Sequence, residues 1–155
     1  MSKNTNQIVY AFTDGGCRGN PGPGGWGVLL KYGKYTKELN GFQDNTTNNQ
    51  MELMAAIQAF EVLNRESVVH ITTDSQYVKN GVTQWMKGWK QKGWKTANNQ
   101  PVKNKELWLR LDKALQNHQA EWFWVKGHSG HPENERVDEL ANLAIDQLQK
   151  EIGNN

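Results

Sequence analysis

The stretch from Ile8 to Asp14 is the feature that most limits how this chain can fold. Its residues are almost all apolar, β-branched or aromatic, which is typical of a strand covered on both faces of a sheet. The stretch ends in a carboxylate, and the run rich in glycine and proline that follows from Gly15 to Gly25 predicts a loop. In open α/β sheets, ligands bind just beyond the carboxyl ends of the strands. Asp14 is therefore a candidate site residue, but an Asp-Gly turn is a common way to end a strand, so the assignment depends on finding partners for Asp14.

The rest of the chain predicts hairpins first and then alternating strands and helices. Gly33-Lys34 suits a two-residue type II′ turn, and Thr47 with Gln50 suits a capping box at the start of a helix. The predicted strands are 26–32, 35–42, 68–73 and 120–125, and the predicted helices run from about 48 to 64, in pieces up to about 116, and from Pro132 onward. This order predicts an α/β fold with a five-stranded mixed sheet and helices on both faces.

Length and composition favour one small intracellular domain. We expect a single domain over residues 1–155, with flexible tails at 1–7 and about 150–155. The only cysteine, Cys17, excludes an intramolecular disulfide and fits a reducing compartment. The polar start of the chain lacks the apolar core of a signal peptide, and no run approaches membrane-spanning length. We therefore expect a cytoplasmic monomer with no membrane association.

Carboxylates without cationic neighbours indicate a metal site. Asp14 and Asp74 each follow an apolar strand, whereas Glu52 and Asp138 lie in predicted helices. Neither helical acid has a basic residue three or four positions away, which argues against a surface salt bridge along its own helix. Acids in apolar surroundings need compensation, and a divalent cation supplies it. Oxygen ligands favour magnesium or manganese over zinc, and hence metal-assisted phosphodiester chemistry.

The histidines suggest proton transfer more than metal binding. The spacing His128-x-x-His131 could bind zinc, but Cys17 is far away in the sequence and no second pair exists. A loop histidine flanked by glycine and near acids is better suited to carry a proton, so His128 is the candidate. His70 and His118 are interpreted as ordinary strand and loop residues.

A basic segment from Lys79 to Lys105 contains no acid at all. Its lysines are Lys79, Lys87, Lys90, Lys92, Lys95, Lys103 and Lys105, interleaved with Trp85, Trp89 and Trp94. Glycines divide it into short pieces, which predicts a protrusion from the sheet. A solvated helical face would explain the lysines alone, and some tryptophans could form the core of the protrusion. The pattern favours a polyanion-binding surface, with amines on phosphates and rings against sugars.

Eight segments of the sequence together resemble the bacterial type 1 ribonucleases H. They occur in the family's order and span about residues 8 to 148: 12–15, 19–25, 46–49, 51–56, 73–77, 94–96, 125–136 and 138–140. The resemblance implies a ribonuclease H-like fold and hydrolysis of the RNA strand of RNA/DNA hybrids with two Mg²⁺ ions, for which Mn²⁺ can substitute.

The resemblance also implies roles for individual residues. Asp14, Glu52, Asp74 and Asp138 would be the metal ligands, and His128 a mobile loop histidine. Contacts to the hybrid are expected at Cys17, Asn20, Thr47, Asn48, Asn49 and Gln76, and in the basic segment at Trp85, Lys87, Trp89, Lys90, Lys92, Trp94, Lys95 and Lys103. Amide side chains can both donate to and accept from a ribose 2′-hydroxyl, which distinguishes RNA from DNA.

Two other functions compete with this one. A non-catalytic module that binds hybrids or duplexes would share the fold, but a pure binder gains nothing from acids held near phosphates. A nuclease of related fold that acts on DNA junctions is a further alternative.

Overall fold

The computed structural model of the protein describes residues 7–127 and 130–153. The strands are β1 (Ile8–Cys17), β2 (Gly22–Tyr32), β3 (Tyr35–Thr46), β4 (Val68–Thr73) and β5 (Gln119–Trp124). The helices are α1 (Asn48–Glu61), α2 (Gln76–Asn80), the π-helical turn η1 (Gly81–Trp85), α3 (Met86–Gln91), α4 (Lys105–Leu115) and α5 (Pro132–Gly153).

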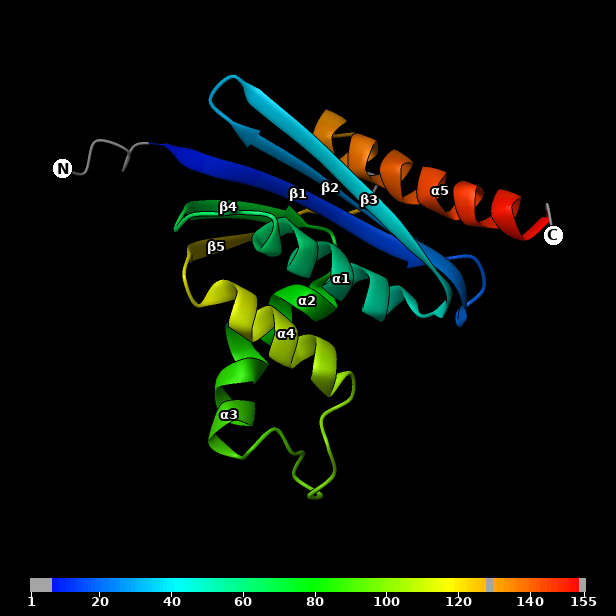
Figure 1. The fold of residues 1–155 in the computed structure, drawn as a ribbon. Coiled ribbons are helices and arrows are strands. Elements are labelled where there is room, and N and C mark those ends of the chain that lie inside the picture. The colour runs from blue at the N-terminus through cyan, green and yellow to red at the C-terminus, as the bar shows by residue number, and fades with distance from the viewer. Residues whose placement is uncertain (1–6, 128–129, 154–155) are drawn as a thin grey trace.

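The strands form one sheet in the order β3-β2-β1-β4-β5 (Figure 1). β1 pairs antiparallel with β2 and parallel with β4, and β4 pairs parallel with β5. The predicted five-stranded mixed sheet is therefore confirmed, with β1 at its centre.

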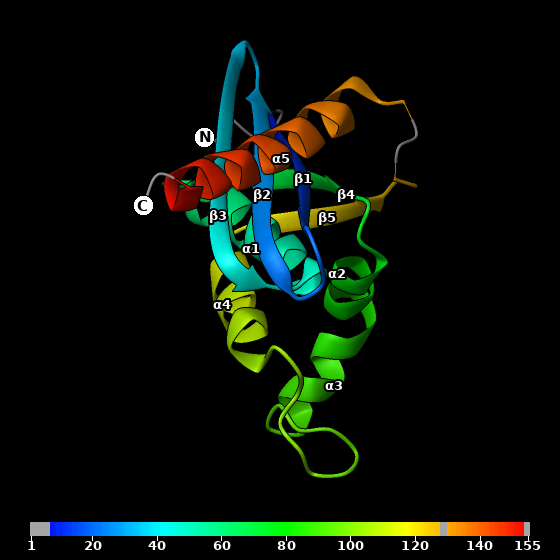
Figure 2. The ribbon, with the colours of Figure 1, turned by 90° about the vertical axis from the view of Figure 1, so that its right-hand side faces the viewer.

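Helices cover both faces of the sheet, as the sequence predicts (Figure 2). α1 packs on one face through small side chains such as Ala55, Ala56 and Ala59, which are fully or almost fully buried. α5 crosses the other face over β2 (Figure 2), and its buried side chains include Val137, Leu140 and Ala141. Small residues allow the helix and sheet backbones to approach each other closely.

The glycine-rich stretch differs from the predicted loop. β1 continues three residues past Asp14 to Cys17, and Cys17 pairs with Gly24 of β2. Only residues 18–21 connect the two strands. Glycine weakens a strand but does not prevent ladder hydrogen bonds, so the antiparallel pairing runs on into this stretch.

Several predicted ends shift by a few residues. Thr47 caps α1 and accepts a hydrogen bond from the Gln50 backbone nitrogen at 3.2 Å, as predicted. The capping box is incomplete, because the Gln50 side chain instead contacts Thr46 and Asn104. α1 ends at Glu61, and α5 remains helical to Gly153, into the region where a flexible tail was expected from about 150.

The basic segment extends away from the sheet (Figure 2). We call residues 79–105 the basic protrusion; it contains η1, α3 and the irregular chain that leads back to α4. Its base is fixed by Trp108 of α4, whose side chain is completely buried. Gly81 lies directly against this indole, which leaves no room there for a larger side chain.

Candidate active site

Three carboxylates meet near the carboxyl ends of the central strands β1 and β4. Thr13 of β1 pairs with Thr73 of β4, so Asp14 and Asp74 follow at the same level of two parallel strands. Glu52, from the first turns of α1, joins them. One oxygen from each of these three side chains lies within 4.8 Å of the others.

Glycine allows α1 to come this close to β1. A Cβ added at Gly15 would lie 2.7 Å from the Glu52 backbone nitrogen, and closer still to the backbone of Met51. Any larger residue at position 15 would therefore push α1 away from the strand. The residue that follows Asp14 thus determines how near Glu52 can lie to it.

The fourth predicted acid, Asp138, approaches from α5. A Cβ at Gly27 would lie 2.5 Å from the Val137 carbonyl oxygen, so this glycine allows α5 to approach β2 where Asp138 begins. The Asp138 side chain lies close enough to that of Asp14 to help raise its pKa. Asp138 therefore borders the cluster of three acids and lines the same cavity. Two of the four acids lie on β1 and directly after β4, and the other two lie on helices that cover opposite faces of the sheet.

The acids raise one another's pKa. Burial, the charge of Asp74 and the contact with Asp138 raise the pKa of Asp14 to about 8, although the Gly15 backbone nitrogen donates to Asp14 Oδ1 at 2.9 Å. Burial, together with the charges of Asp14 and Asp74, raises the pKa of Glu52 well above its ordinary value. Such shifts are expected where carboxylates converge without a cation.

The donor set fits a hard divalent cation. Glu52 Oε1 and Asp74 Oδ1 are shielded from solvent and have no hydrogen-bond partner in the described part of the chain. Buried carboxylate oxygens require a compensating partner, and oxygen ligands of this kind suit Mg²⁺ or Mn²⁺. The acids, with Asn48 and Arg18, line a cavity of about 340 Å³.

A polar cluster stands beside this cavity. The Cys17 backbone nitrogen donates to Asn48 Oδ1 at 2.9 Å, and the Asn48 backbone nitrogen donates to Asn20 Oδ1 at 3.1 Å. The structure therefore brings together three of the residues expected to contact substrate. Asn49 and Gln76 are exposed at the starts of α1 and α2. The Thr47 hydroxyl is engaged as the helix cap.

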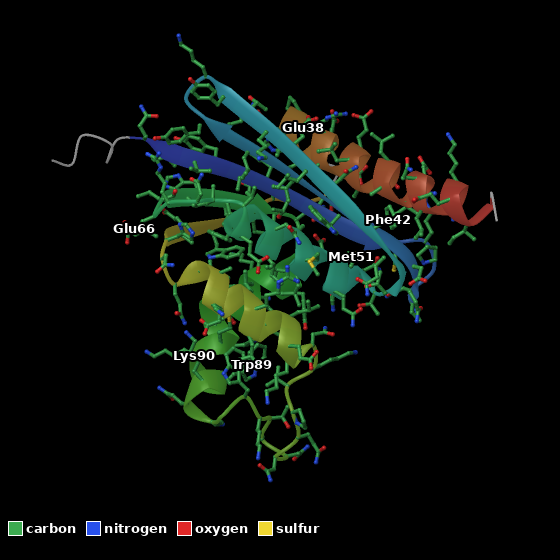
Figure 3. The ribbon with its side chains drawn as sticks, in the orientation of Figure 1. Glu38, Phe42, Met51, Glu66, Trp89 and Lys90 are labelled. Carbon is green, nitrogen blue, oxygen red and sulfur yellow. The ribbon has the colours of Figure 1, made fainter. Side chains whose placement is uncertain are left out.

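The lysines of the basic protrusion are not all equivalent. Lys87, Lys92, Lys95 and Lys103 are exposed. Lys90 pairs with Asp112 of α4 at 2.6 Å, so the absence of acids within the segment does not leave every one of its lysines without a counter-charge. The sequence hides this partner because Asp112 lies beyond the acid-free segment. Figure 3 shows Lys90 and Trp89 on α3, away from the sheet.

The tryptophans of the basic protrusion form a connected aromatic row. Trp85 lies 5.8 Å from Trp89, which in turn lies 6.0 Å from Trp94 and 5.3 Å from the buried Trp108, measured between ring centroids. Trp89 and Trp94 are half-buried and pack against the hydrophobic core. These two rings thus hold the basic protrusion together, as one of the sequence interpretations allowed. Trp85 is 36% exposed and is the ring best placed to meet a ligand.

The structure shows the contacts of His70 and His118 but does not describe His128. His128 lies outside the described residues, so its predicted role stays a prediction. His118 Nδ1 accepts a hydrogen bond from the Ser67 backbone nitrogen at 3.1 Å, and His70 lies 3.4 Å from a Glu121 carboxylate oxygen. Both contacts agree with ordinary strand and loop roles. Among the described residues, the acids Asp14, Glu52 and Asp74 form the only group of three or more possible metal ligands.

The sequence interpretation missed some residues of the cavity wall. Arg18, Asn134 and Asn142 also line it. Arg18 could have been noticed as the one base inside the glycine-rich stretch. Asn134 and Asn142 lie one helical turn before and after Asp138, and side chains at that spacing share a helix face.

Comparisons with known proteins agree on one family. The sequence model of RNase H matches residues 6–146. A protein of Hydrogenovibrio crunogenus named "Ribonuclease H" is 66% identical over 142 residues, which cover 92% of this chain and 98% of that protein. The crystal structure of LC9-RNase H1, a type 1 RNase H with the type 2 active-site motif, is 35% identical with a TM-score of 0.83, covering 91% of this chain and 73% of that one.

A further solved structure contains a nucleic acid. LC11-RNase H1 in complex with RNA/DNA hybrid is 26% identical, with a TM-score of 0.65, and the match covers 91% of this chain and 99% of that one. These likenesses identify the sheet and its helices as an RNase H fold. In the part of the chain that the structure describes, no helix is both long and apolar enough to cross a membrane.

Proposed function

Because the chain belongs to the ribonuclease H family and is a ribonuclease H enzyme, we propose that it cleaves the RNA strand of RNA/DNA hybrids internally and leaves 5′-phosphate and 3′-hydroxyl ends. The observation that carries this proposal is the group of acids Asp14, Glu52 and Asp74, with ligand oxygens within 4.8 Å of one another. The hybrid bound to LC11-RNase H1, a protein of the same fold, supports the substrate class.

The metal sites consist of Asp14, Glu52, Asp74 and Asp138. Two Mg²⁺ ions held there would activate a water and stabilise the leaving 3′-oxygen during in-line attack, and Mn²⁺ would serve in their place. The raised pKa values of Asp14 and Glu52 support this assignment, because such carboxyls release protons when a cation binds. His128 is assigned proton transfer or assistance to product departure, and not metal binding.

Substrate recognition is divided between two surfaces. The polar cluster of Cys17, Asn20 and Asn48, with Asn49 and Gln76, is suited to the RNA strand, since amides donate to and accept from a 2′-hydroxyl. Lys87, Lys92, Lys95 and Lys103 of the basic protrusion are suited to phosphates because they are exposed cations. We assign the enzyme to the cytoplasm. We also assign it as a monomer, and sedimentation of the purified protein would test this oligomeric state.

One cleavage assay tests the proposal. Labelled RNA/DNA hybrid, RNA duplex and DNA duplex are each incubated with Mg²⁺ and with a chelator, and the product ends are determined. Only the hybrid should be cut, only in its RNA strand, and only with metal. Asp14→Asn should bind the hybrid with little change in affinity but not cut it, because Asp14 serves the transition state. Binding without cleavage by the parent protein would favour the non-catalytic module, and cleavage of branched DNA alone would favour the junction nuclease.

A further inference from the structure

Arg18 joins the short loop between β1 and β2 to α5. Its Nη1 donates to Gln149 Oε1 at 2.6 Å and lies 2.8 Å from Asp146 Oδ1. Its Nη2 donates to Asn142 Oδ1 at 3.4 Å. All three partners lie on α5, and two of them are far down the helix from Asp138. Figure 1 shows the loop beside the C-terminal half of α5.

The other side of the same loop is fastened to α1. The Cys17 backbone nitrogen donates to Asn48, and Asn20 accepts from the backbone nitrogen of Asn48. α1 and α5 cover opposite faces of the sheet, so the loop bridges them at the rim of the acidic cavity, which Arg18 itself lines. Cys17 and Asn20 are thus held from one side by Asn48 and from the other through Arg18.

The charge of Arg18 is already matched. The guanidinium fork engages a carboxylate and two amides on α5, so it has a fixed position and a counter-ion. A cation meant to bind a phosphate directly would be expected to lack such a partner. Because the Arg18 and Asp146 side chains are 38% and 60% exposed, the pair adds little to global stability. The arrangement is better suited to holding the loop than to holding the protein together.

We propose that Arg18 is a positioning residue that fixes the 18–21 loop against α5 and so presents Cys17 and Asn20 to the RNA strand. This inference rests on the proposed function and adds to it a residue for hybrid binding. Arg18 then acts before the chemical step: a looser loop must be ordered by the substrate, which raises KM, while the metal-binding acids and kcat stay the same.

The size of the effect follows from the loop. Ordering about one backbone residue on binding corresponds to roughly a tenfold loss of affinity, so Arg18→Ala should raise KM about 3- to 10-fold. The KM of Arg18→Lys should lie between that of the parent and that of Arg18→Ala. A lysine ammonium can still reach Asp146 but cannot form the planar fork that also engages Gln149 and Asn142.

The test compares Arg18→Ala, Arg18→Lys, Asp146→Ala and the double variant with the parent on RNA/DNA hybrid. We expect Asp146→Ala to raise KM less than Arg18→Ala does, because Arg18 then keeps its contacts with Gln149 and Asn142. The double variant should raise KM no further than Arg18→Ala, since the contact with Asp146 is already lost in that variant. kcat should stay within about twofold, and the slope of log K against log salt should be unchanged because no phosphate contact is lost.

A direct phosphate contact predicts the opposite pattern. In that case Arg18→Ala would flatten the salt slope by about 0.9, and Asp146→Ala, which frees the guanidinium, would lower KM. Either result overturns the proposal, as does an unchanged KM in Arg18→Ala.

Arg110→Ala is the matched control. Arg110 forms a comparable exposed fork with Glu61, at 2.8 and 2.7 Å, between α4 and the end of α1. Losing that fork should leave KM unchanged. If Arg110→Ala instead raised KM as much as Arg18→Ala, the rise in Arg18→Ala would reflect a general loosening of the protein and not the positioning of the 18–21 loop. Failure of the proposed function would be evident separately, because the parent protein would then not cut the hybrid at all.

Discussion

The lysines of the basic protrusion should differ in how much they contribute to hybrid binding. Lys87, Lys92 and Lys95 are exposed cations, whereas Lys90 is held 2.6 Å from Asp112, whose side chain is only 18% exposed. A lysine that neutralises a phosphate releases a counterion, and each such contact adds about 0.9 to the slope of log K against log salt. A lysine that is already neutralised by an acid of the protein contributes much less to this slope when the hybrid binds.

The structure therefore predicts how each variant changes the slope of log K against log salt. If Lys87, Lys92 and Lys95 each contact a phosphate, their joint replacement by alanine should flatten the slope by about 2.7. Adding Lys90→Ala should change it little further. Asp112→Ala, which frees Lys90, should steepen the slope by up to about 0.9.

Binding can be measured without turnover. The affinity for a labelled hybrid is determined with a chelator present, in an Asp14→Asn background, from roughly 50 to 200 mM salt, where affinity falls steeply. Lys34→Ala with Lys37→Ala is the control, because these lysines lie at and next to the β2–β3 turn and not in the basic protrusion. In the active enzyme, the triple variant should raise KM and leave kcat within a few-fold.

Three outcomes would refute this reasoning. Lys90→Ala alone could flatten the slope as much as Lys87→Ala, which would mean that Asp112 does not neutralise Lys90. The triple variant could keep the parent slope, which would remove the lysines from the phosphate contacts. It could also lose kcat at saturating hybrid, which would give the basic protrusion a part in the chemistry.

Other changes test the acids, the loop histidine and the packing of the basic protrusion. Asp14→Asn should melt higher than the parent in metal-free, low-salt buffer. Since folding raises the pKa of Asp14 from 3.8 to about 8, the parent loses stability as pH rises through that range, so the variant's advantage should grow from about pH 4 to about 8 and then level off. Mg²⁺ should raise the parent's melting temperature more than the variant's, and a variant that melts lower without metal would reveal a compensating partner. His128→Ala should lower kcat roughly 10- to 10⁴-fold with little change in KM, and a large loss of Mg²⁺ affinity would contradict its role. Gly81→Ala should destabilise the protein by about 1–3 kcal/mol in urea unfolding, because its Cβ would lie 2.6 Å from Trp108 Cζ3, whereas Gly88→Ala, with open space around it, should not.

Local sequence pattern was enough to predict the elements of the sheet and the acids at their ends. The apolar runs before Asp14 and Asp74 predicted β1 and β4. Val137, Leu140 and Ala141 stand at i, i+3 and i+4, the spacing of one face of an amphipathic helix, and this face of α5 is buried. Side chains alternate between the two faces of a strand and repeat about every 3.6 residues around a helix. Each segment's own sequence contains one of these two patterns, so these features can be predicted locally. The absence of bases near Glu52 and Asp138 likewise identified acids that need a partner elsewhere.

The tertiary structure alone decided which of these residues meet and which charges are already used. The approach of Glu52 to Asp14 depends on Gly15 lying under α1, and the pairing of Lys90 with Asp112 joins residues on different helices. Arg18 is the single base of the glycine-rich stretch, and its partners on α5 follow only from the way α5 packs across the sheet beside it. Such contacts join residues far apart in the chain, and their distances are set by how closely two backbones can pack, which no local pattern records.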